Sequence, residues 1–203
     1  MQEEEKEKNG VTASLQKYDE SAQADLLVKA ETWIASGLLP SSIKKPEQAV
    51  VIALKGKELG LETMASFELI DVIMGKPALK PKGMASLIRK GGVRTKTIKD
   101  FEPILDEKGA KVDYITTIRF YRDGIEEDVS YTYRDAERLG LTNKDNWKKQ
   151  PAVMQYWRCY SKGANRVAPD LINGLYTTEE LSSFTPNAPQ IEITEDGDAI
   201  VIQ

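Results

Sequence analysis

Histidine is absent from all 203 residues, and Cys159 is the only cysteine. The missing histidine removes the commonest general base and zinc ligand, and with them every Ser-His-Asp or Cys-His arrangement. One cysteine provides neither a disulfide framework nor a thiolate metal cluster. Gly56-Lys57-Glu58 and Gly75-Lys76-Pro77 lack the earlier glycine and the following Ser or Thr of a Walker loop. We therefore expect a protein that is not an enzyme and needs no cofactor and no metal.

Long hydrophobic runs are also missing. The longest, such as residues 49–54, fall far short of the roughly 20 apolar residues that span a bilayer. Residues 2–7 are mostly acidic, where a signal peptide would place an apolar segment. We expect a cytoplasmic protein with no membrane partner.

The charge is unevenly distributed along the chain, although the net charge is only −4. Residues 1–20 carry −3 and residues 179–203 carry −6, so residues 21–178 carry +5. We expect a disordered acidic tail at 1–20, one folded domain at 21–181 and an acidic tail at 182–203. A basic body favours a polyanionic partner such as nucleic acid, because the local field governs binding more than the total charge does.

Hydrophobic periodicity and capping residues predict helices in the first half of the chain. Ser21 can cap a helix that ends before Gly37, and Pro46 occupies a favourable first-turn position. The expected elements are helices at 21–36, 46–59, 64–69 and 81–90, with strand-like segments at 70–74 and 77–79.

Residues 112–133 alternate in the manner of two strands joined by Asp123-Gly124, a strong hairpin signal. A two-residue loop pairs Arg119 with Asp128, Ile118 with Val129, and Tyr114 with Tyr133. A strand at 93–101 is expected to join this sheet. Further helices are expected at 135–139 and 151–167, while residues 191–202 fit either a small hairpin or a disordered tail. The sequence thus predicts an α+β fold.

The helix at 151–167 has two distinct faces. An apolar stripe of Val153, Trp157, Tyr160, Ala164 and Val167 is typical of a core-facing surface. On another face, three cations recur every four residues and have no acid among them, which fits either a phosphate-binding ridge or a solvated surface. Gly163 interrupts the helix at a cost of about 1 kcal/mol relative to alanine. The three cations are Arg158, Lys162 and Arg166.

Two further groups of basic residues lie outside this helix. Each can follow a phosphate backbone, and each also fits a surface kept soluble by charge. One group precedes the long helix and comprises Lys144, Lys148 and Lys149. The other surrounds the helix at 81–90 and comprises Lys76, Lys80, Lys82, Arg89, Lys90, Arg94 and Lys96.

Several segments, taken in order, resemble the RecT family of phage and prophage single-strand annealing recombinases, which includes Redβ-like proteins. The resemblance spans about residues 25–181. It is carried by residues 54–61 (LKGKELGL), 73–79 (IMGKPAL), 133–136 (YRDA) with Gly140-Leu141, 146–151 (NWKKQP), and 174–181 (GLYTTEEL), together with Arg158, Ser161, Ala164, Arg166 and Pro169-Asp170.

This resemblance implies an ATP-independent protein that coats single-stranded DNA, anneals complementary strands and assembles into rings or helical filaments. It implies a 5′–3′ exonuclease as partner, a bacterial host cell as location, and a curved antiparallel sheet packed on a long helix, with additional N-terminal helices, as in Rad-type annealing proteins. The DNA-binding residues expected are Lys148, Lys149, Arg158, Lys162, Arg166, Lys76, Lys80, Lys82, Arg89, Arg134 and Lys144.

Three alternatives stay open. The helices at 46–60 and 81–91 would form the helix-turn-helix of a duplex-binding regulator, although their connection is long. Four carboxylates would hold magnesium for a nuclease, although Asp128 faces Arg119 in the expected register. A structural phage protein would assemble without DNA. The four carboxylates are Asp113, Glu126, Glu127 and Asp128.

Overall fold

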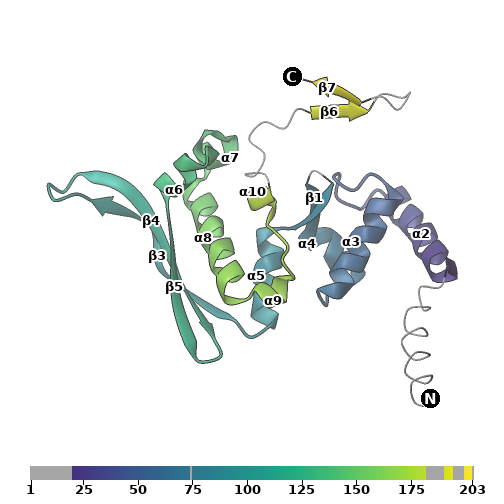
Figure 1. Cartoon of the computed structure of the whole chain (residues 1–203), viewed down its shortest axis with the longest axis horizontal. Coiled ribbons are helices and arrows are strands. Elements are labelled where there is room, and N and C mark those ends of the chain that lie inside the picture. Colours follow the sequence, from purple (N-terminus) through teal and green to yellow (C-terminus); the bar gives the residue numbers. More distant parts are fainter. Residues whose placement is uncertain (1–19, 74, 182–189, 194–198, 203) are drawn as a thin grey trace, which may run out of the picture. The chain divides into compact units, whose positions relative to one another are not determined.

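The computed structural model describes residues 20–73, 75–181, 190–193 and 199–202 (Figure 1). The chain is an α+β protein with antiparallel strand pairing. It divides into two compact units, one reaching Val72 and the other starting at Ile73, a division that the sequence did not indicate. Residues 1–19 of the expected N-terminal tail, and residues 182–189, 194–198 and 203 of the expected C-terminal tail, lie outside the described residues.

The described residues of the first unit form three helices, and the sequence predicted all of them. They are α2 (Glu20–Ala35), α3 (Pro46–Glu58) and α4 (Thr63–Leu69). Gly56 of α3 lies directly against Ser66 of α4, so any larger residue there would push the two helices apart. Strand β1 (Ile70–Ile73) follows α4, and β2 (Lys76–Leu79) and α5 (Pro81–Lys90) come next along the chain, as expected.

A three-stranded antiparallel sheet dominates the second unit. Its strands β3 (Arg94–Leu105), β4 (Lys111–Arg122) and β5 (Ile125–Thr132) lie in the order β3-β4-β5. Both hairpin residues, Asp123 and Gly124, have positive φ, as a two-residue turn between twisted strands requires. The pairings of Arg119 with Asp128 and of Ile118 with Val129 are confirmed.

The expected pairing of Tyr114 with Tyr133 is wrong, because β5 ends at Thr132 and Tyr133 opens helix α6 (Tyr133–Arg138). The side chain of Thr132 accepts a hydrogen bond from the backbone N–H of Asp135 at 3.2 Å. The Asp135 carboxylate accepts one from the N–H of Thr132 at 2.9 Å. This reciprocal capping starts the helix two residues earlier than the sequence pattern predicted.

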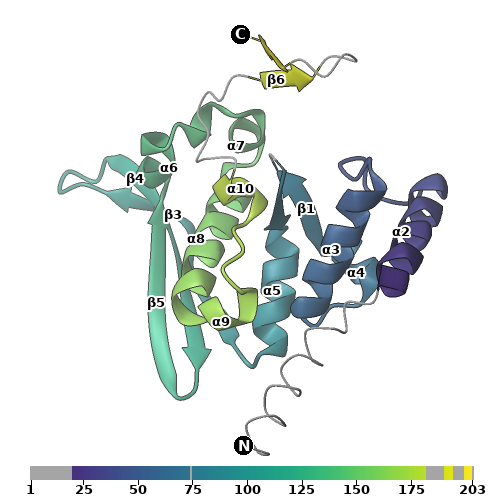
Figure 2. The ribbon, with the colours of Figure 1, turned by 45° about the vertical axis from the view of Figure 1, so that its right-hand side comes forward.

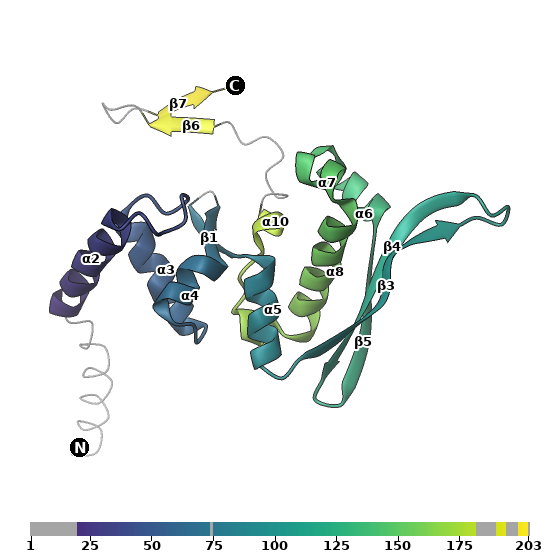
Figure 3. The same ribbon diagram turned by 180° about the vertical axis from the view of Figure 1, so that it is seen from behind.

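The remaining elements connect the sheet to the long helix and continue beyond it. Helix α8 (Pro151–Val167) packs on one face of the sheet, and α5 and α9 (Pro169–Ile172) pack against α8 (Figures 2 and 3). The strands β6 and β7 pair with each other in antiparallel fashion, which favours the hairpin expectation for these residues. The elements are η1 (Leu141–Asn143), α7 (Asp145–Lys149), α8 (Pro151–Val167), α9 (Pro169–Ile172), α10 (Thr178–Leu181), β6 (Gln190–Ile193) and β7 (Ala199–Ile202).

Helix α8 has the predicted bounds, but its predicted apolar stripe is only partly buried. Tyr160 and Ala164 are buried, whereas Val153 is 47% exposed. The side of α8 that faces the sheet includes polar side chains. The Gln155 amide donates to the carbonyls of Tyr131 at 3.0 Å and Tyr114 at 3.2 Å. Hydrogen bonds to strand carbonyls therefore hold polar α8 side chains against the sheet, a role that hydrophobic periodicity does not reveal.

The two longest strands continue past the end of β5 as a projecting ribbon, which Figure 1 shows extending away from the helices. Their pairing reaches Leu105 opposite Lys111. Near the base of the ribbon, the rings of Phe101 and Tyr114 stack with centroids 4.1 Å apart. Phe101 has φ of 53° and lies within the register shift between Lys99 and Glu102, so the stack sits at a bulge in β3.

Candidate nucleic-acid interface

Helix α5 presents a basic surface above a buried apolar face. Met84, Leu87 and Ile88 are buried, while Lys82 and Arg89 are exposed together with Lys90. Pro81 at the first position fixes the start of the helix, and no acidic residue occurs within it. The apolar face anchors the helix against the core, so the cations face outward from a rigid element.

An open hollow of about 540 Å³ lies between α5 and α8. The α5 residues that line it are spaced at i, i+3, i+4, i+7 and i+8, which places them on one face of the helix. Trp157 of α8 contributes the aromatic part of the lining. Three cations and no carboxylate line the hollow, so its local charge is strongly positive. The lining residues are Lys82, Ala85, Ser86, Arg89, Lys90 and Trp157.

Neighbouring aromatic rings hold Trp157 in place. Its ring centroid lies 5.3 Å from that of Tyr156 and 5.7 Å from that of Tyr160. Tyr160 is buried, and burial raises the pKa of its hydroxyl; Thr95 and the charge of Arg89 act in the opposite direction.

The three cations of α8 do not form one continuous exposed ridge, because Arg158 is buried against the sheet, whereas Lys162 and Arg166 are exposed but contact β5. Lys162 donates to the carbonyl of Ser130 at 3.0 Å. Arg166 forms an ion pair with Glu127 at 2.6 Å. The missing acid of this helix face is thus supplied by β5. Arg158 is only 6% exposed, and its Nε has no hydrogen-bond partner.

Arg158 lies in the interior beside Tyr131. Burial raises the pKa of the Tyr131 hydroxyl, and the charge of Arg158 partly offsets that effect. Within the described residues Arg158 has no carboxylate partner, and a buried cation without one is costly to the folded state. Its burial removes it from the surface that a polymer could reach.

The other expected DNA-binding residues lie on the surface but are not part of the hollow. Lys148 and Lys149 are exposed at the end of α7, and Lys76 is exposed in β2. Lys144 and Lys80 precede α7 and α5, respectively. Arg134 is exposed, and its guanidinium donates to the carbonyl of Val112 at 3.4 Å.

The hollow thus contains two of the expected residues, Lys82 and Arg89. Lys90 belongs to the basic group that the sequence placed around helix α5 but not to the expected DNA-binding residues, and Trp157 was expected in the core. The spacing of Lys90 and Arg89 from Lys82 places all three on one helix face, a signal available from the sequence. The part played by Trp157 depends on how α8 packs beside α5 and has no such signal.

The carboxylates considered for a nuclease are engaged in other interactions. Asp128 and Glu126 bind Arg119 at 2.6 Å and 3.3 Å, and Glu127 binds Arg166. The Asp113 carboxylate accepts from the backbone N–H of Arg134 at 3.2 Å. Within the described residues, no group of three or more acids or thiols is placed to hold a metal ion.

The helix-turn-helix alternative requires two helices joined by a short turn. Helices α3 and α5 instead belong to different compact units, with α4, β1 and β2 between them along the chain.

Among the described residues, no helix is both long and apolar enough to cross a membrane. No protein family, curated protein or solved structure was found to match the chain.

Proposed function

We propose that the chain binds single-stranded DNA, anneals complementary strands without ATP and assembles into rings or helical filaments on the DNA. The observation that carries the proposal is the hollow between α5 and α8, which three cations of α5 and the ring of Trp157 line together. Proteins that bind single strands combine a cationic groove with aromatic rings on which bases stack. We include a 5′–3′ exonuclease that exposes the strand as the expected partner.

The residues of the hollow would perform two tasks. Lys82 and Arg89 are seven residues apart on α5, or about 10 Å along the helix axis. They would hold phosphates at the two ends of the hollow, and Lys90 would add a third positive charge. A base would stack on Trp157, an interaction worth about 1–3 kcal/mol for each base in single-strand binders. Lys148 and Lys149, exposed at the end of α7 just before α8 begins, would extend the phosphate path.

The proposal is tested by measuring the affinity for a labelled oligonucleotide at several salt concentrations. Each phosphate contact on a single strand contributes about 0.7 to the slope of log affinity against log salt. Lys82→Ala with Arg89→Ala should therefore lower that slope by about 1.4. Lys44→Ala with Lys57→Ala changes the charge equally at exposed positions in the first unit and should leave the slope unchanged.

Annealing is measured with two complementary oligonucleotides in the absence of ATP. The wild-type chain should accelerate duplex formation, and Trp157→Leu should slow it while leaving the salt slope in place. A preference for duplex over single strands would support the regulator instead. Magnesium-dependent cleavage of the oligonucleotide would support the nuclease. No binding to single strands would contradict the proposal.

A further inference from the structure

The two edges of the β3-β4-β5 sheet carry opposite charge. The start of β3 holds Arg94, Lys96 and Lys99 and no acid before Asp100. The start of β5 holds Glu126, Glu127 and Asp128 and no base. We call these the basic edge and the acidic edge. The sheet is therefore polarised across its width.

The strand register aligns these charges in rows. One row runs from Arg94 through Tyr121 to Glu126. The next runs from Lys96 through Arg119 to Asp128. Each row begins with a base on β3 and ends with an acid on β5.

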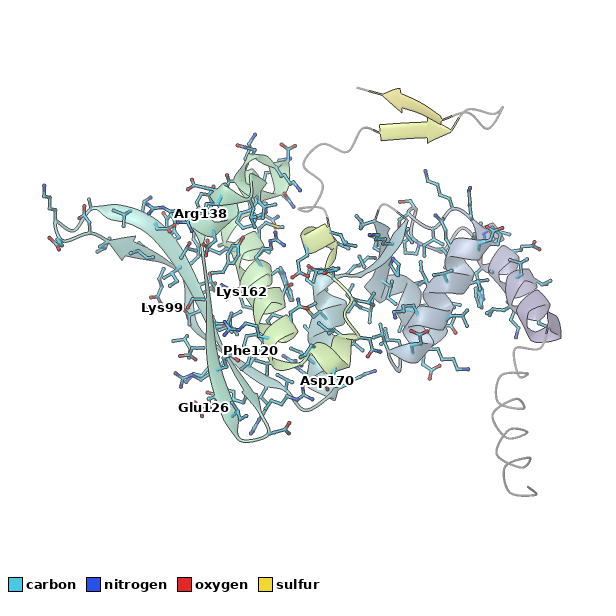
Figure 4. The ribbon with its side chains drawn as sticks, in the orientation of Figure 1. Lys99, Phe120, Glu126, Arg138, Lys162 and Asp170 are labelled. Atoms are coloured by element: carbon cyan, nitrogen blue, oxygen red, sulfur yellow. The ribbon has the colours of Figure 1, made fainter. Side chains whose placement is uncertain are left out.

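The rows lie on the face of the sheet opposite α8. Phe120 points toward α8, where its ring meets that of Tyr160 at 5.6 Å, so the adjacent Arg119 and Tyr121 point the other way. Figure 4 shows Lys99 on the side away from α8 and Lys162 on the helix side. The helix therefore leaves these rows uncovered.

Each outer strand pairs with only one neighbour among the described residues, since the order is β3-β4-β5. Arg94, Lys96, Glu126 and Asp128 are all exposed, and Ile125 at the start of β5 is 70% exposed. An unpaired strand edge is a template for pairing with another chain. Two edges of like charge repel each other, whereas a basic edge and an acidic edge attract. The charges therefore favour pairing of a β3 edge with a β5 edge over pairing of two identical edges.

We infer that copies of this chain join edge to edge, with β5 of one copy beside β3 of the next. Both strands run antiparallel to β4, so they are parallel to each other, and a second copy in the same orientation brings them together in parallel. Arg94 of that copy then lies beside Glu126, and its Lys96 lies beside Asp128. The carbonyl of Ser130 already accepts a hydrogen bond from Lys162. The pairing of β5 with β3 of the next copy therefore involves mainly residues 125–128 of β5.

Such a contact joins two different surfaces and so repeats from copy to copy. A repeated contact of this kind produces a closed ring or an open helical filament, depending on the rotation between copies. The inference deepens the self-assembly part of the proposed function and rests on it. DNA binding is measured separately, so a failure of either part is recognised by itself.

The first test reverses the charge of one edge at a time. Arg94→Glu with Lys96→Glu makes both edges acidic. A second variant makes both edges basic through Glu126→Lys combined with Arg119→Asp and Asp128→Arg. Because residues 119 and 128 exchange their charges, the ion pair between them is kept. Each variant alone should need at least about tenfold more protein for assembly. An equimolar mixture should assemble as the wild type does, because every contact then joins a basic edge to an acidic edge.

Sedimentation velocity, with and without a single-stranded oligonucleotide, measures the assembly. Lys44→Glu with Lys57→Glu serves as a charge-matched control outside the sheet. Circular dichroism confirms that each variant folds, and oligonucleotide anisotropy reports binding independently. A wild-type chain that stays monomeric under both conditions overturns the inference, as does a mixture that assembles no better than its two components.

Disulfide trapping is a second test, and it does not depend on whether the charge-reversal variants fold. Positions 94 and 126 of one chain are two strands apart, or about 10 Å, whereas the edge-to-edge contact places position 94 of one copy beside position 126 of the other, within reach of a disulfide. Arg94→Cys mixed with Glu126→Cys should therefore give a cross-linked dimer under mild oxidation. Glu107→Cys at the exposed end of the ribbon replaces Glu126→Cys in the control mixture. Equal cross-linking in both mixtures overturns the inference.

Discussion

Gly163 of α8 lies directly against the ring of Phe120 on β4, where a Cβ atom would overlap the ring. The missing side chain lets the helix approach the sheet closely enough for Gln155 and Cys159 to reach strand carbonyls. Glycine destabilises the helix itself by about 1 kcal/mol relative to alanine, but it allows the close contact between α8 and the sheet.

Gly163→Ala should lower the free energy of unfolding by about 1–3 kcal/mol despite the better helix propensity of alanine. Urea unfolding followed by circular dichroism measures this. Combining it with Phe120→Leu makes room beside the helix, so the double variant should lose less stability than the two single losses added together. A Gly163→Ala variant more stable than wild type would contradict the close contact.

Arg158→Met should leave the affinity for single strands within about twofold, since Arg158 is buried and does not line the hollow. Its salt slope should equal that of the wild type, in contrast to Lys82→Ala with Arg89→Ala. Methionine keeps most of the volume and removes a buried unpaired charge, so the stability should stay the same or rise. A lowered salt slope would instead return Arg158 to the binding surface.

Cys159 should be almost unreactive toward thiol reagents in the folded protein. Burial raises the pKa of its thiol to about 11, and its Sγ donates to the carbonyl of Val129 at 3.1 Å. At pH 8 the thiolate is therefore on the order of a hundredfold scarcer than for an exposed cysteine. Reaction with a chromogenic disulfide should be slow in buffer and fast in urea. Equal rates in both solutions would show that the α8–sheet contact opens readily.

Asp170 should contribute to the stability at neutral pH but not in strong acid. Arg122 donates to both carboxylate oxygens at 2.6 Å and holds the pKa of Asp170 below its ordinary value. The stabilisation is therefore present above about pH 3.9, the value for the unfolded chain, and is lost as the pH falls through the lowered folded value.

Asp170→Asn should accordingly lower the unfolding midpoint in urea at pH 7 more than at pH 2.5. Asp100→Asn, at an exposed position in β3, is the matched control. An Asp170→Asn effect of equal size at both pH values would show that the ion pair with Arg122 does not form in solution.

The sequence by itself determined most of the secondary structure of the described residues, because the local signals are strong. Pro46, Pro81 and Pro151 mark the first residues of their helices, and Asp123-Gly124 fixes the hairpin and its register. It also determined that the chain has no histidine and too few cysteines for a disulfide framework or a thiolate metal cluster. These features depend on backbone preferences within a few residues and need no knowledge of distant partners.

Only the tertiary structure decided which side of α8 faces the sheet. Periodicity assigned Arg158, Lys162 and Arg166 to an exposed ridge, since the helix itself has no acid to pair with them. The partners come from β5, as Glu127 and the Ser130 carbonyl, which lie more than thirty residues away in sequence. The hollow around Trp157 and the opposite charges of the sheet edges likewise arise when distant segments pack together. Their physical cause is side-chain pairing across elements, which a single helix or strand cannot reveal.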